Sequence, residues 1–151
     1  SDGTANTISA YGRASPSSVA FKAAVYDDNG SGGEPTTIKS YSTAVTANAT
    51  PQWWEADITD VDLTAGDWYV GVLAGGSYFW FYYDSDSWTS RTLAGWQYNY
   101  TTPGNWAPVS DSHVTYKFCV YSTYTPEGGG AATWQPRPGI ISPSGGGFLM
   151  F

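Results

Sequence analysis

Residues 18–26 read Ser-Val-Ala-Phe-Lys-Ala-Ala-Val-Tyr, and their side chains fall into two alternating rows. Val19, Phe21, Ala23 and Val25 form an apolar row, and the residues between them form a second row that contains the lysine. Successive side chains of a β-strand point to opposite faces of its sheet. The stretch therefore predicts a strand with one face in a hydrophobic core and the other in water.

The same period of two recurs along the chain, whereas no stretch longer than about ten residues has helical spacing. Further strands are expected at 4–14 (with Ile8 and Ala10 facing inward), 37–45, 52–58, 67–74, 77–83, 96–100 and 113–125. A dense run of turn formers at 27–35 predicts a loop. The Gly75-Gly76 pair predicts a tight hairpin that makes 67–74 and 77–83 antiparallel neighbours.

This pattern of about eight strands without crossover helices predicts an all-β fold. The expected architecture is an antiparallel β-sandwich, jelly-roll-like, that spans residues 1–125. Composition changes after Thr125, where prolines and glycine runs begin. Residues 126–151 are therefore expected to form an irregular Pro/Gly-rich C-terminal tail with too little apolar surface for a core of its own.

The tail nevertheless carries large apolar side chains, which predict docking on a partner. These are Trp134, Ile140, Ile141, Phe148, Leu149, Met150 and Phe151. Burying the last four is worth roughly 6 to 12 kcal/mol, against about 4 to 8 kcal/mol of backbone entropy. Three alternatives stay open: the tail docks on a neighbouring subunit, folds back on its own sandwich, or remains disordered.

Net charge argues against several classes of partner. Six Lys and Arg stand against 13 Asp and Glu, for a net charge of -7. Neither nucleic acid nor an anionic membrane is an expected ligand. No apolar run approaches the ~20 residues of a membrane span, and no signal-peptide layout is present. Any targeting segment is expected to have been removed or never to have been there.

Catalytic groups are not expected in this chain. Cys119 and His113 are the single cysteine and histidine, which excludes intramolecular disulfides, His-based triads and thiolate-rich zinc sites. Glu55 and Asp57 share one side of a strand and match an acid/base pair for sugar hydrolysis, but solvated surface carboxylates are the favoured interpretation. The sequence thus predicts a protein that is not an enzyme.

No cofactor is predicted, although two acidic loops keep a structural calcium ion open as an alternative. Asp27 and Asp28 in one loop, and Asp84 and Asp86 in another, offer the oxygen ligands that calcium takes. Neither loop has the spacing of the twelve-residue calcium loop. Turn formation requires the same residue types and is the favoured interpretation.

Aromatic residues are the most informative set, since 17% of the chain is aromatic. Rings stack on sugars and anchor protein interfaces. The candidates for a surface or glycan-binding role are Trp53, Trp54, Tyr78, Trp80, Tyr82, Trp88 and Trp96. Since both faces of the expected strand at 77–83 carry rings, one face is expected in the core and the other against a partner, a second sheet or a glycan.

Two turn-and-strand motifs resemble a known module. Residues 21–30, Phe-Lys-Ala-Ala-Val-Tyr-Asp-Asp-Asn-Gly, and residues 63–72, Leu-Thr-Ala-Gly-Asp-Trp-Tyr-Val-Gly-Val, carry the resemblance. They are similar to a jelly-roll-like β-sandwich module of bacteriophage virion proteins (decoration or tail) and secreted bacterial proteins. The resemblance covers residues 4–125 and implies the fold, no catalytic residues, and adhesive or particle-surface functions.

The leading hypothesis is therefore a structural virion protein, either a capsid decoration or a tail-associated module. It is expected at the virion surface, bound to protein partners as a homo-oligomer or within a larger assembly. The alternative is a secreted, extracellular carbohydrate-binding module that stacks exposed Trp and Tyr on sugars. An enzyme is the third hypothesis.

Overall fold

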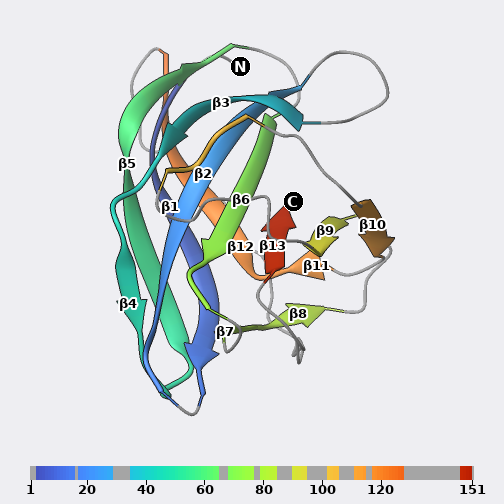
Figure 1. Ribbon diagram of the computed structural model, residues 1–151. Helices are drawn as coiled ribbons and strands as arrows, with labels where there is room; N and C mark the ends of the chain where they lie inside the picture. Colours follow the sequence, from blue (N-terminus) through green and yellow to red (C-terminus); the bar gives the residue numbers. More distant parts are fainter. Residues whose placement is uncertain are drawn as a thin grey trace.

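A computed structural model describes residues 3–15, 17–28, 35–64, 68–76, 79–84, 90–94, 102–105, 111–114, 117–127 and 147–150. The strands in these ranges are β1 (Gly3–Ala14), β2 (Val19–Asp28), β3 (Pro35–Tyr41), β4 (Val45–Ala47), β5 (Gln52–Leu63), β6 (Trp68–Ala74), β7 (Phe79–Phe81), β8 (Tyr83–Asp84), β9 (Ser90–Ala94), β10 (Asp111–Val114), β11 (Lys117–Phe118), β12 (Val120–Pro126) and β13 (Gly147–Met150). Two antiparallel sheets pack face to face (Figure 1), which confirms the predicted all-β sandwich. No helix in this part of the chain is long and apolar enough to cross a bilayer.

The smaller sheet is centred on β1. β5 pairs along one edge of β1 over nearly its whole length. Along the other edge β12 pairs with the first part of β1 and β7 pairs with its last three residues, so the two partners follow one another end to end. The register with both long partners shifts between Ala5 and Thr7. A bulge there explains why Ala5 and Ile8, three residues apart, are both buried.

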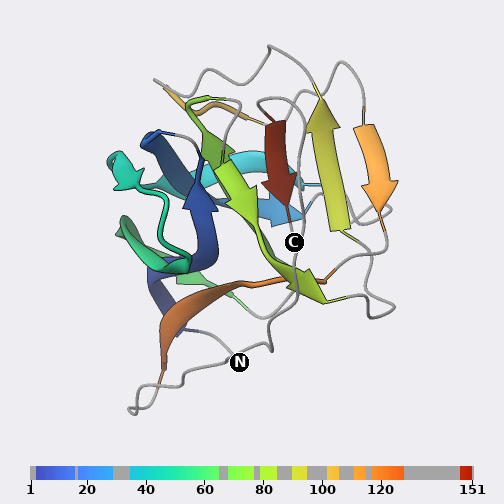
Figure 2. The same cartoon turned by 90° about the horizontal axis from the view of Figure 1, so that it is seen from below.

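The larger sheet has the strand order β10-β9-β13-β6-β2-β3, and β4 also pairs with β2. Its strands come from distant parts of the chain. Figure 2 shows β13, the last strand in the sequence, lying between β6 and β9. The short strands β8 and β11 pair only with each other among the described strands.

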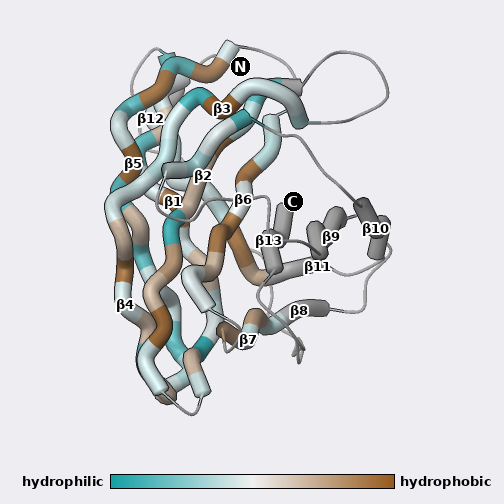
Figure 3. Tube along the Cα trace, viewed as in Figure 1, coloured by the Kyte–Doolittle hydropathy of each residue, from teal (hydrophilic) through white to brown (hydrophobic). Residues whose placement is uncertain are grey.

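The core lies between the two sheets and draws on both. Its larger buried members are Ile8, Val19, Phe21, Val25, Ile58, Val72, Phe79, Phe81 and Val120. The ring of Phe79 contacts the rings of Phe21 and Phe81, with centroids 5.0 and 4.4 Å apart. Figure 3 shows the alternation of hydrophobic and hydrophilic residues along the long strands that builds this core.

β2 is buried on both faces at Ala24 and Tyr26, so the expectation of one face in water is wrong for that half of the strand, whereas Ala20 and Lys22 are half-buried. Its predicted core row is buried as expected, but Tyr26 of the opposite row is 0% exposed as well. A second cluster covers that face and consists of Ala24, Tyr26 and Leu73 with Ile38 and Tyr69. Beside it, Asn105 accepts a hydrogen bond from the backbone N of Ile38 at 3.1 Å. A segment about 80 residues downstream in the sequence therefore approaches the face that local alternation assigns to solvent.

The Gly75-Gly76 pair does not join two neighbouring strands, so the predicted hairpin is wrong. β6 pairs with β2 and β13, whereas β7 pairs with β1 in the opposite sheet. Phe79 and Phe81 of β7 are each 2% exposed and lie in the core. Burying two such rings is worth about 3 to 6 kcal/mol. This gain favours a crossing between sheets over a local hairpin.

The single strand expected at 113–125 is also wrong. The chain forms β10, β11 and β12 there, and each pairs with a different partner: β9, β8 and β1. Cys119 bends the chain between β11 and β12. Its backbone N donates to the carbonyl of Tyr82 at 2.9 Å. This bond holds the bend in the middle of the predicted strand.

The C-terminal region contributes a strand to the larger sheet. β12 ends at Pro126, and Gly147–Met150 form β13. For these four residues the arrangement corresponds to the alternative in which the tail folds back on its own sandwich. The domain boundary at 125/126 stays a prediction. The strand expected at 96–100 lies outside the described residues.

The hydroxyl of Ser42 is expected to contribute more to the free energy of unfolding than the hydroxyl of nearby Ser40. The Ser42 hydroxyl accepts a hydrogen bond from the backbone N of Ala23 at 2.9 Å, and both residues are buried. Ser42→Ala leaves that N–H buried without its acceptor, and we expect a loss of about 1 to 3 kcal/mol in denaturant unfolding.

The control is Ser40→Ala, because the Ser40 hydroxyl donates to the carbonyl of exposed Thr59 at 2.6 Å. Water can replace that donor, so the expected loss is at most about 1 kcal/mol. Equal losses in the two variants would contradict this account.

Candidate functional site

The outer face of the smaller sheet carries the main aromatic surface of the described residues. On β1, Ile8 and Ala10 point into the core, so Ser9 and Tyr11 point outward. Tyr11 lies opposite Trp53 of β5 in the strand register. Ser9 lies opposite Tyr121 of β12. The three strands thus place rings on one open sheet face.

Four rings form a continuous chain of contacts on this face. The centroids of Tyr11 and Trp53 are 5.4 Å apart, those of Trp53 and Tyr121 are 5.0 Å apart, and those of Tyr11 and Tyr82 are 5.0 Å apart. The ring planes are inclined by 60 to 69°. Tilted and edge contacts of this kind are favourable, and they fix the ring orientations. We call Tyr11, Trp53, Tyr82 and Tyr121 the aromatic cluster.

Ser9 explains how rings from the two outer strands meet across β1. Trp53 lies on β5 and Tyr121 on β12, which flank β1 on opposite sides. Their rings are in contact, and Ser9 between them is only 1% exposed although it faces outward. A small side chain at this position leaves room for both rings above it.

A backbone junction positions Tyr82 in the cluster. Along β1, the pairing with β12 ends at Ala10 and the pairing with β7 begins at Gly12. At this junction the backbone N of Tyr11 donates to the carbonyl of Cys119 at 2.8 Å, and the backbone N of Tyr82 donates to the carbonyl of Tyr11 at 3.2 Å. The bond from Cys119 N to Tyr82 O closes the set. Tyr82 is therefore held by main-chain bonds to β1, and its ring follows the outward direction of Tyr11.

Carboxylates continue the same face along β5. Glu55 and Asp57 are exposed and alternate with the buried Ala56 and Ile58. Thr7 donates its hydroxyl hydrogen to Asp57 at 3.4 Å. This face combines rings with exposed oxygen acceptors, and such a surface can take the C–H faces and the hydroxyls of a sugar at once.

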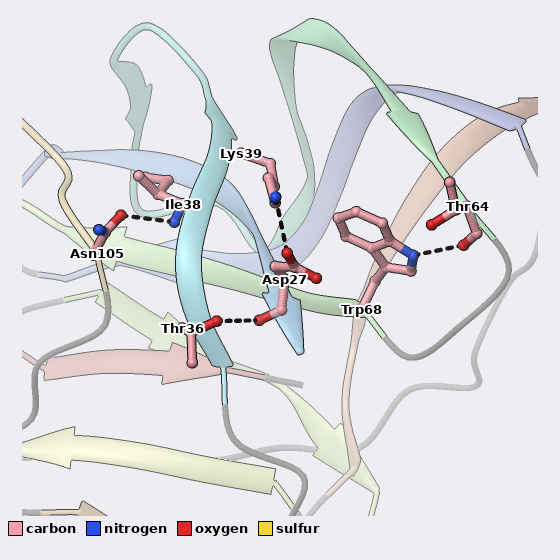
Figure 4. Close-up of polar contacts among 7 residues, drawn as sticks. All are labelled: Asp27, Thr36, Ile38, Lys39, Thr64, Trp68 and Asn105. Carbon is pink, nitrogen blue, oxygen red and sulfur yellow. Dashed lines mark hydrogen bonds and ion pairs between the residues drawn. The ribbon is translucent and has the colours of Figure 1, made fainter. Parts of the chain in front are cut away.

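The remaining described tryptophans have other surroundings. Trp54 faces the core side, and its indole N–H donates to the carbonyl of Gly12 at 2.9 Å. Trp68 packs against the main core and donates to the carbonyl of Thr64 at 2.9 Å (Figure 4). Trp80 is opposite Arg13 in the β1–β7 register, and among the described residues its buried indole nitrogen has no hydrogen-bond partner.

Sequence reasoning missed two members of the aromatic cluster and one exposed ring of the larger sheet. Tyr11 and Tyr121 belong to the aromatic cluster, and Tyr41 of β3 is 42% exposed, with Lys22 Nζ 5.5 Å from its ring centroid. The signal for Tyr11 was its position in the row opposite to Ile8 and Ala10. Three other predicted surface residues, Tyr78, Trp88 and Trp96, lie outside the described residues.

The predicted acidic loops do not come together as a metal site in the described part of the chain. Asp27 forms an ion pair with Lys39 at 2.8 Å, and its carbonyl accepts a hydrogen bond from the Thr36 hydroxyl at 3.4 Å (Figure 4). Asp28 ends β2 and Asp84 ends β8. Asp86 lies outside the described ranges. No group of three or more His, Cys, Asp or Glu among the residues described is placed to hold a metal ion.

The single histidine and cysteine lie in different parts of the fold. His113 is in β10, opposite Arg91 of β9, and Cys119 is buried at the junction beside Tyr82.

Of the predicted docking residues, Phe148, Leu149 and Met150 are in β13. Trp134, Ile140, Ile141 and Phe151 lie outside the described residues.

The aromatic cluster leaves part of its surface accessible, since Trp53 is 37% exposed. The core therefore does not bury all the aromatic rings of the chain, and some of them remain in contact with solvent. Comparison of the chain with protein-family models, with curated proteins and with solved structures gave no match.

Proposed function

We propose that this chain is a non-catalytic recognition module that binds carbohydrate on the outer face of the smaller sheet. The aromatic cluster is the observation that carries the proposal. Three of its rings come from β1, β5 and β12 and the fourth from Tyr82, which lies between β7 and β8. The rings contact one another at 5.0 to 5.4 Å, and Trp53 is 37% exposed. The exposed indole of Trp53 offers the flat apolar face on which a pyranose ring stacks, and the inclined neighbouring rings hold it in place.

Neutral sugars are the expected class of ligand. The carboxylates of Glu55 and Asp57 lie beside the rings and can accept hydrogen bonds from sugar hydroxyls. The same carboxylates and the net charge of -7 repel acidic glycans. A neutral oligosaccharide can stack one ring on Trp53 and donate hydroxyl hydrogen bonds to the carboxylates along β5.

The cluster is also held rigidly, which favours binding. Tyr11 and Trp53 are paired residues of two long strands, and Tyr82 is fixed by backbone bonds to Tyr11. Rings that are ordered before the ligand arrives lose little conformational entropy on binding. This differs from a platform built on loops.

Trp53→Ala is expected to reduce the affinity for a neutral oligosaccharide tenfold or more, which corresponds to about 1.4 kcal/mol or more. The substitution removes the most exposed ring of the cluster and its contacts with Tyr11 and Tyr121. A glycan array of neutral oligosaccharides identifies the ligand, and calorimetry with the best one measures the change.

The matched control is Tyr41→Ala, which removes an exposed ring from the other sheet. It is expected to leave the affinity unchanged, and Trp53→Phe is expected to restore part of it. Silence of the wild-type chain on the array, or equal losses in the two alanine variants, would exclude carbohydrate binding by this face.

A second proposal is the function of a structural virion protein, as a capsid decoration or tail-associated module. The position of β13 favours it, because a C-terminal strand that completes a sheet can equally complete the sheet of a neighbouring copy. An electron micrograph of the native assembly tests this function. Recovery of the chain only as a free secreted protein would contradict it.

A further inference from the structure

β13 is the last strand of the sequence but an inner strand of the larger sheet. It is antiparallel to β6, with Phe148 opposite Leu73 and Leu149 opposite Val72. On its other side it is antiparallel to β9, with Phe148 opposite Leu93. Four residues at the end of the chain thus pair on both edges.

Within the described strands, β13 is what connects β9 and β10 to the rest of the sheet. The order β10-β9-β13-β6 has no direct pairing between β9 and β6. Without β13, the edge of β6 facing away from β2 and the facing edge of β9 both expose unpaired N–H and C=O groups. Open edges of this kind bind another strand readily.

We propose that the slot between β6 and β9 of one copy accepts β13 of a second copy, and that two chains exchange these strands reciprocally. Every backbone pair that β13 makes within one chain is available unchanged between two chains. Exchange of an identical element therefore costs little, and reciprocal exchange closes a symmetric dimer.

The length of the connecting segment permits the exchange. Residues 128–146 separate the described ends of β12 and β13, and they include six glycines and three prolines. A chain of 19 residues spans at most about 65 Å. A compact domain of this size has a radius of gyration of about 15 Å. Reaching the slot of a neighbouring copy is thus within the span of the segment.

Protein concentration decides between the closed and the exchanged form. A strand tethered to its own domain has an effective concentration of the order of millimolar at its own slot. Exchange is therefore expected to become substantial as the protein approaches that concentration. This inference is independent of carbohydrate binding, because the aromatic cluster lies on the other sheet, and it supplies a physical route for the proposed assembly function.

A cross-linking experiment with two single-cysteine chains tests the exchange. One chain carries Phe148→Cys and the other Leu93→Cys, both with Cys119→Ser, and one is labelled with ¹⁵N. Residues paired across two strands have Cβ atoms about 5 Å apart, so a short bismaleimide links the two positions only when β13 of one chain lies beside β9 of the other. The control partner carries Tyr41→Cys, because β3 lies at the opposite edge of the sheet from β9 and β10.

The expected result is a cross-linked heterodimer at least tenfold more abundant than with the control partner, and rising from about 10 µM to about 1 mM protein. A third chain with both Phe148→Cys and Leu93→Cys must cross-link internally at high dilution, which verifies that the substituted strands still pair.

Internal cross-linking combined with heterodimer yields equal to the control overturns the proposal. As a second readout, native mass spectrometry of mixed labelled and unlabelled wild-type chains is expected to show mixed dimers that Leu149→Pro abolishes, since proline removes the strand N–H. Monomers alone at 1 mM, or dimers that survive Leu149→Pro, also overturn it. If exchange is observed but electron micrographs show no particle, strand exchange is supported and only the proposed assembly function is contradicted.

Discussion

Replacement of Phe21 by alanine is expected to lower the free energy of unfolding by about 3 to 5 kcal/mol. Phe21 is 0% exposed near the start of β2, and the centroids of its ring and the ring of Phe79 are 5.0 Å apart. Truncation removes the transfer free energy of the ring and leaves a cavity between two sheets that cannot both relax. For a chain of this length the midpoint of thermal unfolding should fall by roughly 10 °C.

Denaturant unfolding of the single variants Phe21→Ala and Phe79→Ala and of the double variant measures this effect. The two rings touch, so the double loss should fall short of the sum by about 0.5 to 1.5 kcal/mol. A loss below about 1 kcal/mol for Phe21→Ala would mean that Phe21 is not a central residue of the core. Full additivity would mean that the two rings are not in contact.

The second large effect is expected from Gly12→Ala. A Cβ at Gly12 meets Cε1 of Phe79 and the backbone O of Trp80, each at 2.7 Å. Gly12 is also held between β5 and β7, where it pairs with Gln52 and Phe81. A backbone carbonyl in a paired strand cannot move cheaply, so we expect a loss of about 2 to 3 kcal/mol from overpacking.

Gly104→Ala is the matched control for this substitution. Gly104 is exposed, and a Cβ there has no atom within 4 Å. Its stability is expected to stay within about 0.5 kcal/mol of wild type, or to rise slightly because alanine restricts the unfolded chain. Similar changes at the two glycines, measured by denaturant unfolding, would show that the close approach of β7 to β1 does not require glycine.

The two proposals use opposite sheets and therefore do not compete. The aromatic cluster is on the outer face of β1, β5 and β12, whereas β13 lies in the sheet of β6 and β9. A dimer formed by strand exchange would present two aromatic clusters. Two linked sites raise the apparent affinity for a polymeric glycan when both can be engaged together.

Most long strands could be predicted from alternation alone. The rows of β1 and β2 that face the core, with Ile8, Ala10, Phe21 and Val25, are the rows read from the sequence. Alternation identifies these strands because one face of each is buried against the same core. Alternation does not indicate whether another segment covers the opposite face of a strand, and for that reason it did not predict the burial of Tyr26.

The candidate site was only partly predictable. Trp53 and Tyr82 were expected at a surface, and both belong to the aromatic cluster. Tyr11 and Tyr121 are not among the predicted surface residues. They join the cluster only because the strand register brings residues more than 100 positions apart side by side. Trp54, the neighbour of Trp53, is also a predicted surface residue, but it faces the core side, where its indole N–H donates to the carbonyl of Gly12.

By itself the sequence determined that this chain forms an all-β sandwich, because the period of two in its apolar residues can bury a core only as pleated sheets. Only the tertiary structure decided the pairing partners: β7 crosses to β1 instead of joining β6, and the C-terminal strand lies between β6 and β9. The physical reason is that side-chain alternation is a local property, whereas strand pairing depends on the burial of side chains from distant segments against one another. The same global packing gathers four rings on one open face and leaves Trp53 accessible to a ligand.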